Sequence, residues 1–188
     1  MPNLRLLHVS QNTGLDVAFT GSSDTLIEVK MHATSTSSVT GISRYPNLLS
    51  LHMSESSLGN IAFPQELLLL TKLNNLHMAN CNLEGELPDE IYKLESLREL
   101  NLYDNELTGL LPAGLQYLTS LNLLTLSHNH FRGQLPTWLN DLTELQQLYL
   151  EYNQLTGELV SLHQATRLTR VYLDNNEFRE NIPANFFW

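Results

Sequence analysis

Residues 97–105 read Leu97-Arg98-Glu99-Leu100-Asn101-Leu102-Tyr103-Asp104-Asn105, which has the form LxxLxLxxN. The same form recurs at 121–129, at 145–153 and, with Val171 in the second apolar place, at 168–176. Weaker copies start at positions 4, 26, 48 and 73. Eight copies therefore follow one another at intervals of 22 to 25 residues. A fixed period of this length indicates a repeat fold in which each unit stacks on the next.

Each copy predicts a short strand. The xLxL segment alternates between inward and outward side chains, as a strand does, and its leucines face the core. A leucine-rich helical bundle is excluded because the apolar places do not continue at a helical period. Glycine or proline also recurs within the strong units and would weaken or break a helix. Stacking the units gives one leucine core and a parallel sheet on the concave side of the array.

The second half of the strong units carries a common tail, as in Leu107-Thr108-Gly109-Leu110-Leu111-Pro112. The glycine is expected to permit a backbone turn. The proline, which recurs at Pro88, Pro136 and Pro183, is expected to start a short helical or 3-10 segment on the convex side. This LxGxLP tail resembles the plant-type leucine-rich repeat of receptor-kinase ectodomains and polygalacturonase-inhibiting proteins. The resemblance implies an α/β right-handed solenoid and a binding role.

We expect residues 1–188 to form a single leucine-rich-repeat domain, with degenerate repeats over 1–72 and regular ones over 73–188. A solenoid needs polar end units to shield its core. Here Leu4 opens a repeat almost at once, and the paired-cysteine caps that the resemblance implies are missing. The pattern favours a piece of a longer array.

The last place of the LxxLxLxxN form predicts a structural ladder. An asparagine offers donors and an acceptor to buried backbone groups where the strand turns inward. Thr34 and Ser56 occupy this place in repeats two and three. Cys81, the one cysteine, is interpreted as a buried ladder member and not as a reactive thiol. The predicted ladder comprises Asn12, Cys81, Asn105, Asn129, Asn153 and Asn176.

The outward residues at places 2, 3, 5, 7 and 8 form the candidate binding surface. Four of the seven tyrosines and five of the seven histidines fall there. Tyrosine supplies rigid contact area with a polar tip, and acids favour a basic ligand. Alternatively, tyrosine simply suits exposed strand positions. Thr125 and Ser127 are small, so a shallow groove is expected in repeat six. The predicted ligand-binding residues are Tyr103, Asp104, His128, Tyr149, Glu151, Tyr152, Tyr172 and Asp174.

A secondary patch of basic side chains is predicted in the N-terminal half. It comprises His8, Lys30, His52 and His77. His52 and His77 should be neighbours on adjacent strands, with Glu55 as the nearest acid. Zinc needs a third or fourth ligand, so we predict neither a metal site nor a cofactor. The remaining interpretations are a pH-responsive patch and plain solvated histidines.

Composition narrows the function. Twenty acidic residues against ten lysines and arginines give a net charge of −10, which disfavours nucleic acid and anionic lipid as partners. The apolar runs are too short for a membrane span. Neither a nucleophile elbow nor an HExxH motif occurs, and phosphate-loop and kinase motifs are also missing, so the sequence predicts a protein that is not an enzyme.

Three functions remain open. The first is a module of a receptor-like or signalling protein that binds a protein or peptide on its concave face. The second is a regulator or inhibitor docking onto an enzyme through that face, and the third is a scaffold that assembles through its open ends. The sequence shows no signal peptide, no Asn-x-Ser/Thr sequon and no possible disulfide, which leans toward the cytoplasm. An extracellular ectodomain piece is the alternative.

Overall fold

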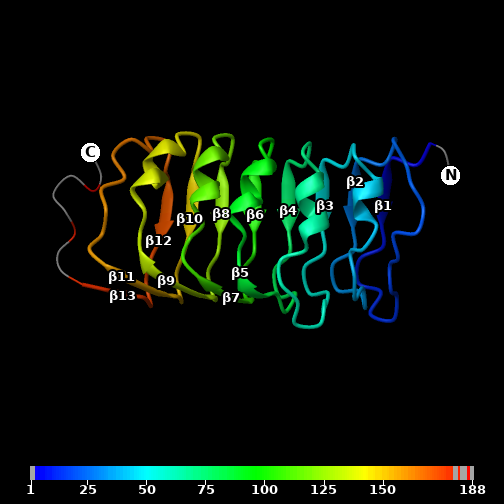
Figure 1. Cartoon of the computed structure of the whole chain (residues 1–188), viewed down its shortest axis with the longest axis horizontal. Helices are drawn as coiled ribbons and strands as arrows, with labels where there is room; N and C mark the ends of the chain where they lie inside the picture. Colours follow the sequence, from blue (N-terminus) through cyan, green and yellow to red (C-terminus); the bar gives the residue numbers. More distant parts are fainter. Residues whose placement is uncertain (1–2, 180–181, 183–185, 187–188) are drawn as a thin grey trace.

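The computed structural model describes residues 3–179, 182 and 186, so the proline tail predicted at Pro183 lies outside the described residues. The chain winds into an elongated solenoid whose successive repeats advance along its long axis (Figure 1). No helix within residues 3–179 reaches the length and hydropathy that a bilayer span requires.

Eight parallel strands form one sheet, which confirms the predicted architecture. Each strand occupies places three to five of its repeat, so that equivalent residues pair, as Leu100 does with Leu124. The strands, in their order across the sheet, are β1 (Leu6–His8), β2 (Glu28–Lys30), β3 (Ser50–His52), β4 (Asn75–His77), β6 (Glu99–Asn101), β8 (Leu123–Thr125), β10 (Gln147–Tyr149) and β12 (Arg170–Tyr172). We call the outward surface of this sheet, predicted above as the concave face, the sheet face.

A second sheet was not predicted. It contains β13 (Glu177–Phe178), β11 (Gln154–Gly157), β9 (His130–Gln134), β7 (Glu106–Gly109) and β5 (Glu84–Glu86), in that order. This sheet explains why the tail carries a glycine. Gly109 has φ +83°, and an added Cβ would lie 2.8 Å from Glu86 Cγ on the neighbouring strand. Upstream of β5 the pairing shrinks to a single bridge between Ile61 and Leu83. The second sheet therefore accompanies the regular repeats.

Short 3-10 helices form a row in front of the eight-stranded sheet in Figure 1. They are η1 (Ile42–Arg44), η2 (Gln65–Leu69), η3 (Asp89–Lys93), η4 (Ala113–Tyr117) and η5 (Thr137–Asp141). Pro88, Pro112 and Pro136 each stand immediately before such a helix in an extended conformation. The predicted proline-started 3-10 segments are therefore confirmed where the chain is described. We call this side the helical face.

Leucines from both halves of each repeat fill the space between the strands and the 3-10 helices. Leu100, Leu124 and Leu148 of the sheet are fully buried, as are Leu115 and Leu139 from the helical side. Because each repeat alone would leave these side chains exposed on two sides, their burial requires both neighbouring repeats. The shared core fixes the register of the sheet and thereby the rows of outward side chains.

The ladder residues bind backbone groups of the turns. Asn105 Oδ1 accepts the amides of Cys81 and Leu83 at 3.0 Å, and its Nδ2 donates to the carbonyls of Met78 and Leu102. Asn129, Asn153 and Asn176 make the same kind of contacts one repeat further on each time. Asn12 is exposed and donates only to carbonyls of its own turn.

Cys81 occupies the equivalent place with different chemistry. Its side chain is fully buried, and Sγ donates to the Met53 carbonyl at 3.2 Å. Burial raises the pKa of the Cys81 thiol to about 11, which keeps it protonated at neutral pH. A thiol supplies the donor of the asparagine amide but not a comparable acceptor.

Candidate functional site

The turn after each strand has a repeated backbone conformation that positions two outward side chains. The eighth-place residues Asp104, His128 and Tyr152 all have φ near +54°, in the left-handed region that non-glycine residues seldom occupy. Their amides donate to the seventh-place carbonyls of the next repeat, as His128 N does to Glu151 O at 3.0 Å. The turns are therefore tied to one another as regularly as the strands are.

The four tyrosines predicted to bind the ligand lie in two separate stacks. In the strand stack, the rings of Tyr149 and Tyr172 are 5.1 Å apart and nearly parallel, at 10°. In the turn stack, His128 lies 4.9 Å from Tyr103 and 4.2 Å from Tyr152. The division follows from register, because fifth-place residues stack on the strands while seventh- and eighth-place residues stack along the turns.

The prediction of a shallow groove in repeat six is wrong in one respect. Ser127 has no exposed surface, so it cannot be the open floor of a groove. Thr125 on β8 is half-buried. The repeat pattern places Ser127 in its row, but it does not show that the side chain is buried.

The acids of the candidate site have no cationic partner. None of the ion pairs among the described residues includes Asp104, Glu151 or Asp174. The guanidinium of Arg170 instead donates to Gln147 Oε1 at 3.2 Å, and the Tyr149 hydroxyl donates to the same oxygen. Ion pairs among the described residues therefore do not neutralise the negative charge of this half of the sheet face.

The predicted histidine patch divides into two groups. In the first, Glu28 accepts from Lys30 at 2.9 Å and contacts His8 Nε2 at 2.6 Å. The hydrogen bond from Lys30, followed by that from His8, lowers the pKa of the Glu28 carboxyl. These contacts satisfy the charges locally, so the first group is a surface ion-pair cluster.

The second group joins His52 and His77 on adjacent strands, with ring centroids 4.3 Å apart. The acid beside them is Glu99, which lies 3.0 Å from His77 Nε2, and not Glu55 as expected. Glu99 belongs to the neighbouring strand β6, whereas Glu55 has φ +59° in the turn beyond β3. Residues 3–179 contain no cluster of three or more side chains suited to holding a metal ion.

The histidine pair predicts a pH-dependent stability. Burial, followed by repulsion from His77 and Lys30, lowers the pKa of His52 from 6.5 to about 4. An unfolded chain would take up this proton below pH 6.5, while the folded chain would not until about pH 4. The stability due to neutral His52 is therefore complete above pH 6.5 and is lost as pH falls toward 4.

We expect His52→Gln to flatten the pH dependence of the unfolding free energy across this window, as measured by urea denaturation at several pH values. His163→Gln, at an exposed position far along the chain, is the control and should leave the slope unchanged. An unchanged slope in the His52 variant would show that the ring is not held neutral by the fold.

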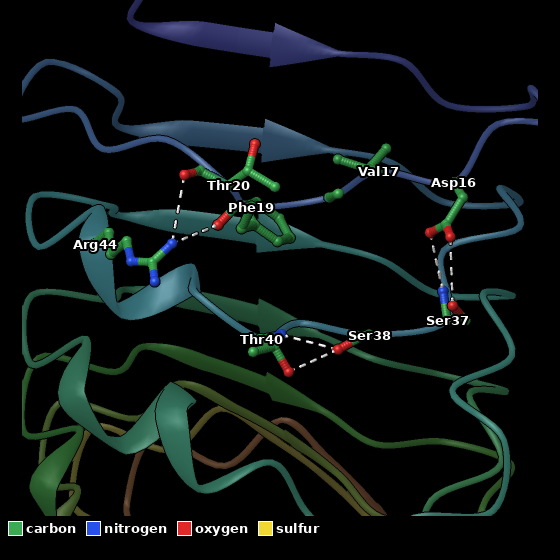
Figure 2. Close-up of a pocket in the computed structure, with 9 residues that line it drawn as sticks. Asp16, Val17, Phe19, Thr20, Ser37, Ser38, Thr40 and Arg44 are labelled. Carbon is green, nitrogen blue, oxygen red and sulfur yellow. Dashed lines mark hydrogen bonds between the residues drawn. The ribbon is translucent and has the colours of Figure 1, made fainter.

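A cavity of about 330 Å³ lies among the irregular N-terminal repeats (Figure 2). On one side Asp16 accepts hydrogen bonds from the amide and hydroxyl of Ser37. On the other, Arg44 donates to the carbonyls of Phe19 and Thr20. Both charged side chains are thus used in joining segments that lack the second sheet. We interpret the cavity as a consequence of the irregular repeats.

Comparison with known proteins agrees with these features. The sequence model of the leucine rich repeat matches residues 71–131. No curated protein sequence is similar enough to be matched. Among solved structures, the ectodomain of the plant membrane receptor kinase GASSHO1/SCHENGEN3 from Arabidopsis thaliana, in complex with CASPARIAN STRIP INTEGRITY FACTOR 2, is 27% identical with a TM-score of 0.89. The match covers 95% of this chain and 22% of that one.

A second similar structure is that of the Arabidopsis receptor kinase HAESA in complex with the peptide hormone IDA and the co-receptor SERK1. It is 29% identical, with a TM-score of 0.86, and the match covers 97% of this chain and 32% of the other. This chain therefore spans between a fifth and a third of the length of these two relatives.

The fold and the row of outward side chains are those of a leucine-rich-repeat solenoid. In sequence and structure the chain is similar to the ectodomains of plant receptor kinases. Because those ectodomains belong to membrane receptors, they give no support to the cytoplasmic interpretation.

Proposed function

We propose that this chain is a peptide-binding or protein-binding module of a receptor-like protein, with the ligand held on the sheet face over β8, β10 and β12. The observation that carries the proposal is the pairing of two exposed ring stacks with acids that have no cationic partner. The structures of similar ectodomains with a peptide hormone support a peptide as ligand.

The chemistry of this surface favours a basic ligand. Tyr152 and Tyr172 are 49% and 47% exposed, although each stacks on a neighbouring ring. Stacked rings lose little conformational entropy on binding, and their faces attract cations. Glu151 and Asp174 lie beside these rings in the seventh place. A basic residue flanked by apolar groups would contact rings and carboxylates together, and the net charge of −10 would accelerate its approach.

An enzyme regulator would use the same face, but its partner would be a folded surface and not a linear segment. Binding of a short linear peptide would therefore favour the receptor-like function over the regulatory one.

We also propose that the module works on the extracellular side of a membrane, as the ectodomains it resembles do.

Selection from a displayed library of random linear peptides tests the proposal. We expect the selected peptides to be enriched in arginine and lysine, and to bind faster at low salt because screening weakens attraction beyond about 8 Å at physiological ionic strength. The double variant Tyr149→Ala, Tyr172→Ala should bind them at least tenfold more weakly while retaining its fold.

The matched control is Tyr92→Ala with Tyr117→Ala. These two tyrosines also form an exposed ring pair, with centroids 6.1 Å apart, but on the helical face. If the control pair abolishes peptide binding and the sheet-face pair does not, the ligand binds on the opposite side from the one proposed.

A further inference from the structure

Two polar atoms in the seventh-place row are buried without a hydrogen-bond partner. They are Ser127 Oγ and Glu151 Oε2. The two residues belong to adjacent repeats, which the hydrogen bond from His128 N to Glu151 O ties together at 3.0 Å. Among the described residues that are not exposed, the one other unpartnered side-chain atom is Ser10 Oγ, in the same place of the first repeat.

Unpartnered buried atoms of this kind oppose folding, because water solvates them in the unfolded chain. The cost is greatest for a carboxylate oxygen, which needs a donor. Nothing described in this chain supplies that donor: Arg170 donates to Gln147, and the next acid in the row, Asp174, accepts from its own neighbour Asn175 at 2.6 Å. Glu151 is thus the acid of this row that is left with an open acceptor.

The chemistry of the missing group follows from its surroundings. A group with two N–H donors would satisfy Glu151 Oε2 with one and Ser127 Oγ, which can accept as well as donate, with the other. A cationic group fits better than a neutral one because it is attracted to Glu151 and Asp174, and both carboxylates would repel a carboxylate or phosphate. A guanidinium group presents several donors in a rigid plane and stacks readily on aromatic rings, so it meets both requirements better than an ammonium group does.

We propose that Ser127 and Glu151 form an anchoring subsite for an arginine side chain of the ligand. The proposal rests on the proposed function and deepens it. Glu151 is bracketed by Tyr149 and Tyr152, which place a ring on either side of it along the chain, with Leu150 between them buried in the core. Because Ser127 has no exposed surface, the proposal requires a ring of the turn stack to rotate toward solvent when arginine binds. Tyr103 and Tyr152 are 38% and 49% exposed, so neither ring is enclosed by the core.

The test uses N-acetyl-L-arginine amide as the probe, titrated into the whole chain and followed by amide chemical shifts. The neutral isostere N-acetyl-L-citrulline amide is the ligand control. We expect the arginine probe to shift the amides of residues 125–128 and 149–152 and to bind at least tenfold more tightly than citrulline. Glu151→Gln should weaken arginine binding at least tenfold, and Ser127→Ala should weaken it severalfold.

Ser10→Ala is the matched control, because it removes an equally unpartnered hydroxyl from the same place in a repeat without the ring stacks. It should leave arginine binding unchanged. Neither Ser127→Ala nor Glu151→Gln should lower the melting temperature, since no bond within the chain is lost. Equal binding of arginine and citrulline to the unaltered chain, or shifts centred away from these segments, would overturn the subsite without any variant being made.

The outcomes also separate this inference from the proposed function. If library peptides depend on Tyr149 and Tyr172 but arginine binding ignores Glu151→Gln, the subsite is wrong and the peptide-binding function stands. If arginine binds at Glu151 while peptide binding ignores the two tyrosines, the subsite stands as a cation site and the proposed function is wrong.

Discussion

Asn129→Ala is expected to lower the free energy of unfolding by about 3 kcal/mol, because removing the amide leaves several buried backbone groups without partners. Asn129 Oδ1 accepts from Leu107 N at 3.0 Å, and Nδ2 donates to the carbonyls of Leu102 and Leu126 at 2.9 and 3.1 Å. These groups belong to two different repeats. The substitution therefore weakens the contact between repeats as well as the turn itself.

The adjacent residue provides the control. His130 is exposed on β9, where it lies 2.8 Å from Glu106 Oε2 and 3.2 Å from Gln154 Nε2. Exposed ion pairs contribute about 0–1 kcal/mol, so His130→Ala should cost less than 1 kcal/mol. Urea denaturation followed by circular dichroism measures both variants. Equal midpoint shifts would contradict the register in which Asn129 faces inward and His130 faces solvent.

Gly114→Ala should be the other strongly destabilising substitution, at about 3 kcal/mol. Gly114 lies in η4, and an added Cβ would stand only 1.8 Å from the Asp89 carbonyl oxygen and 3.2 Å from Ile91 Cγ2. Backbone atoms cannot yield as the end of a flexible side chain can. The row of 3-10 helices must therefore separate between η3 and η4, and overpacking of this kind costs about 1–3 kcal/mol or more.

Gly14→Ala is the matched substitution at a position with open space, since nothing lies within 4 Å of its added Cβ. It should be neutral or slightly stabilising, because alanine restricts the unfolded chain. Thermal unfolding of the two variants side by side decides the matter. A Gly114 variant with the same melting temperature as the unaltered chain would contradict the close approach of the two 3-10 helices.

The periodic part of the fold is readable from the sequence because its elements recur: the described residues contain eight strands of the first sheet and five 3-10 helices. Leu100, Leu124 and Leu148 pair with one another in the sheet. The same sequence pattern in each repeat therefore supports the strand predicted in the next. Pro88 and Pro112 likewise mark where 3-10 helices begin, because the proline ring fixes φ at the residue before the helix. Elements set by local, repeated constraints were therefore predictable.

The second sheet was not predictable in the same way. Its strands carry sequences such as Glu84-Gly85-Glu86, which lack the alternation of a half-buried strand. They pair because the eight-stranded sheet and the ladder already hold successive repeats in register. Gly114 was missed for a related reason: its neighbour Asp89 belongs to the preceding repeat, and the sequence spacing gives no distance between them.

The candidate site was predictable as rows of residues but not as contacts. The pattern places Tyr149 and Tyr172 in one row, and the structure adds that their rings are nearly parallel. The repeat pattern shows neither the burial of Ser127 nor the open acceptor of Glu151. A repeat pattern specifies which face a side chain occupies, while its hydrogen-bond partners depend on packing.

The most direct measurement of the central claim is photo-crosslinking of a library-selected peptide from two positions. One protein carries p-benzoylphenylalanine in place of Tyr172 on the sheet face, and the other carries it in place of Tyr117 on the helical face. Both tyrosines are well exposed, at 47% and 61%, so the crosslinker reaches solvent at either position. Our account predicts a peptide adduct from position 172 and none from position 117. An adduct from position 117 alone would contradict it.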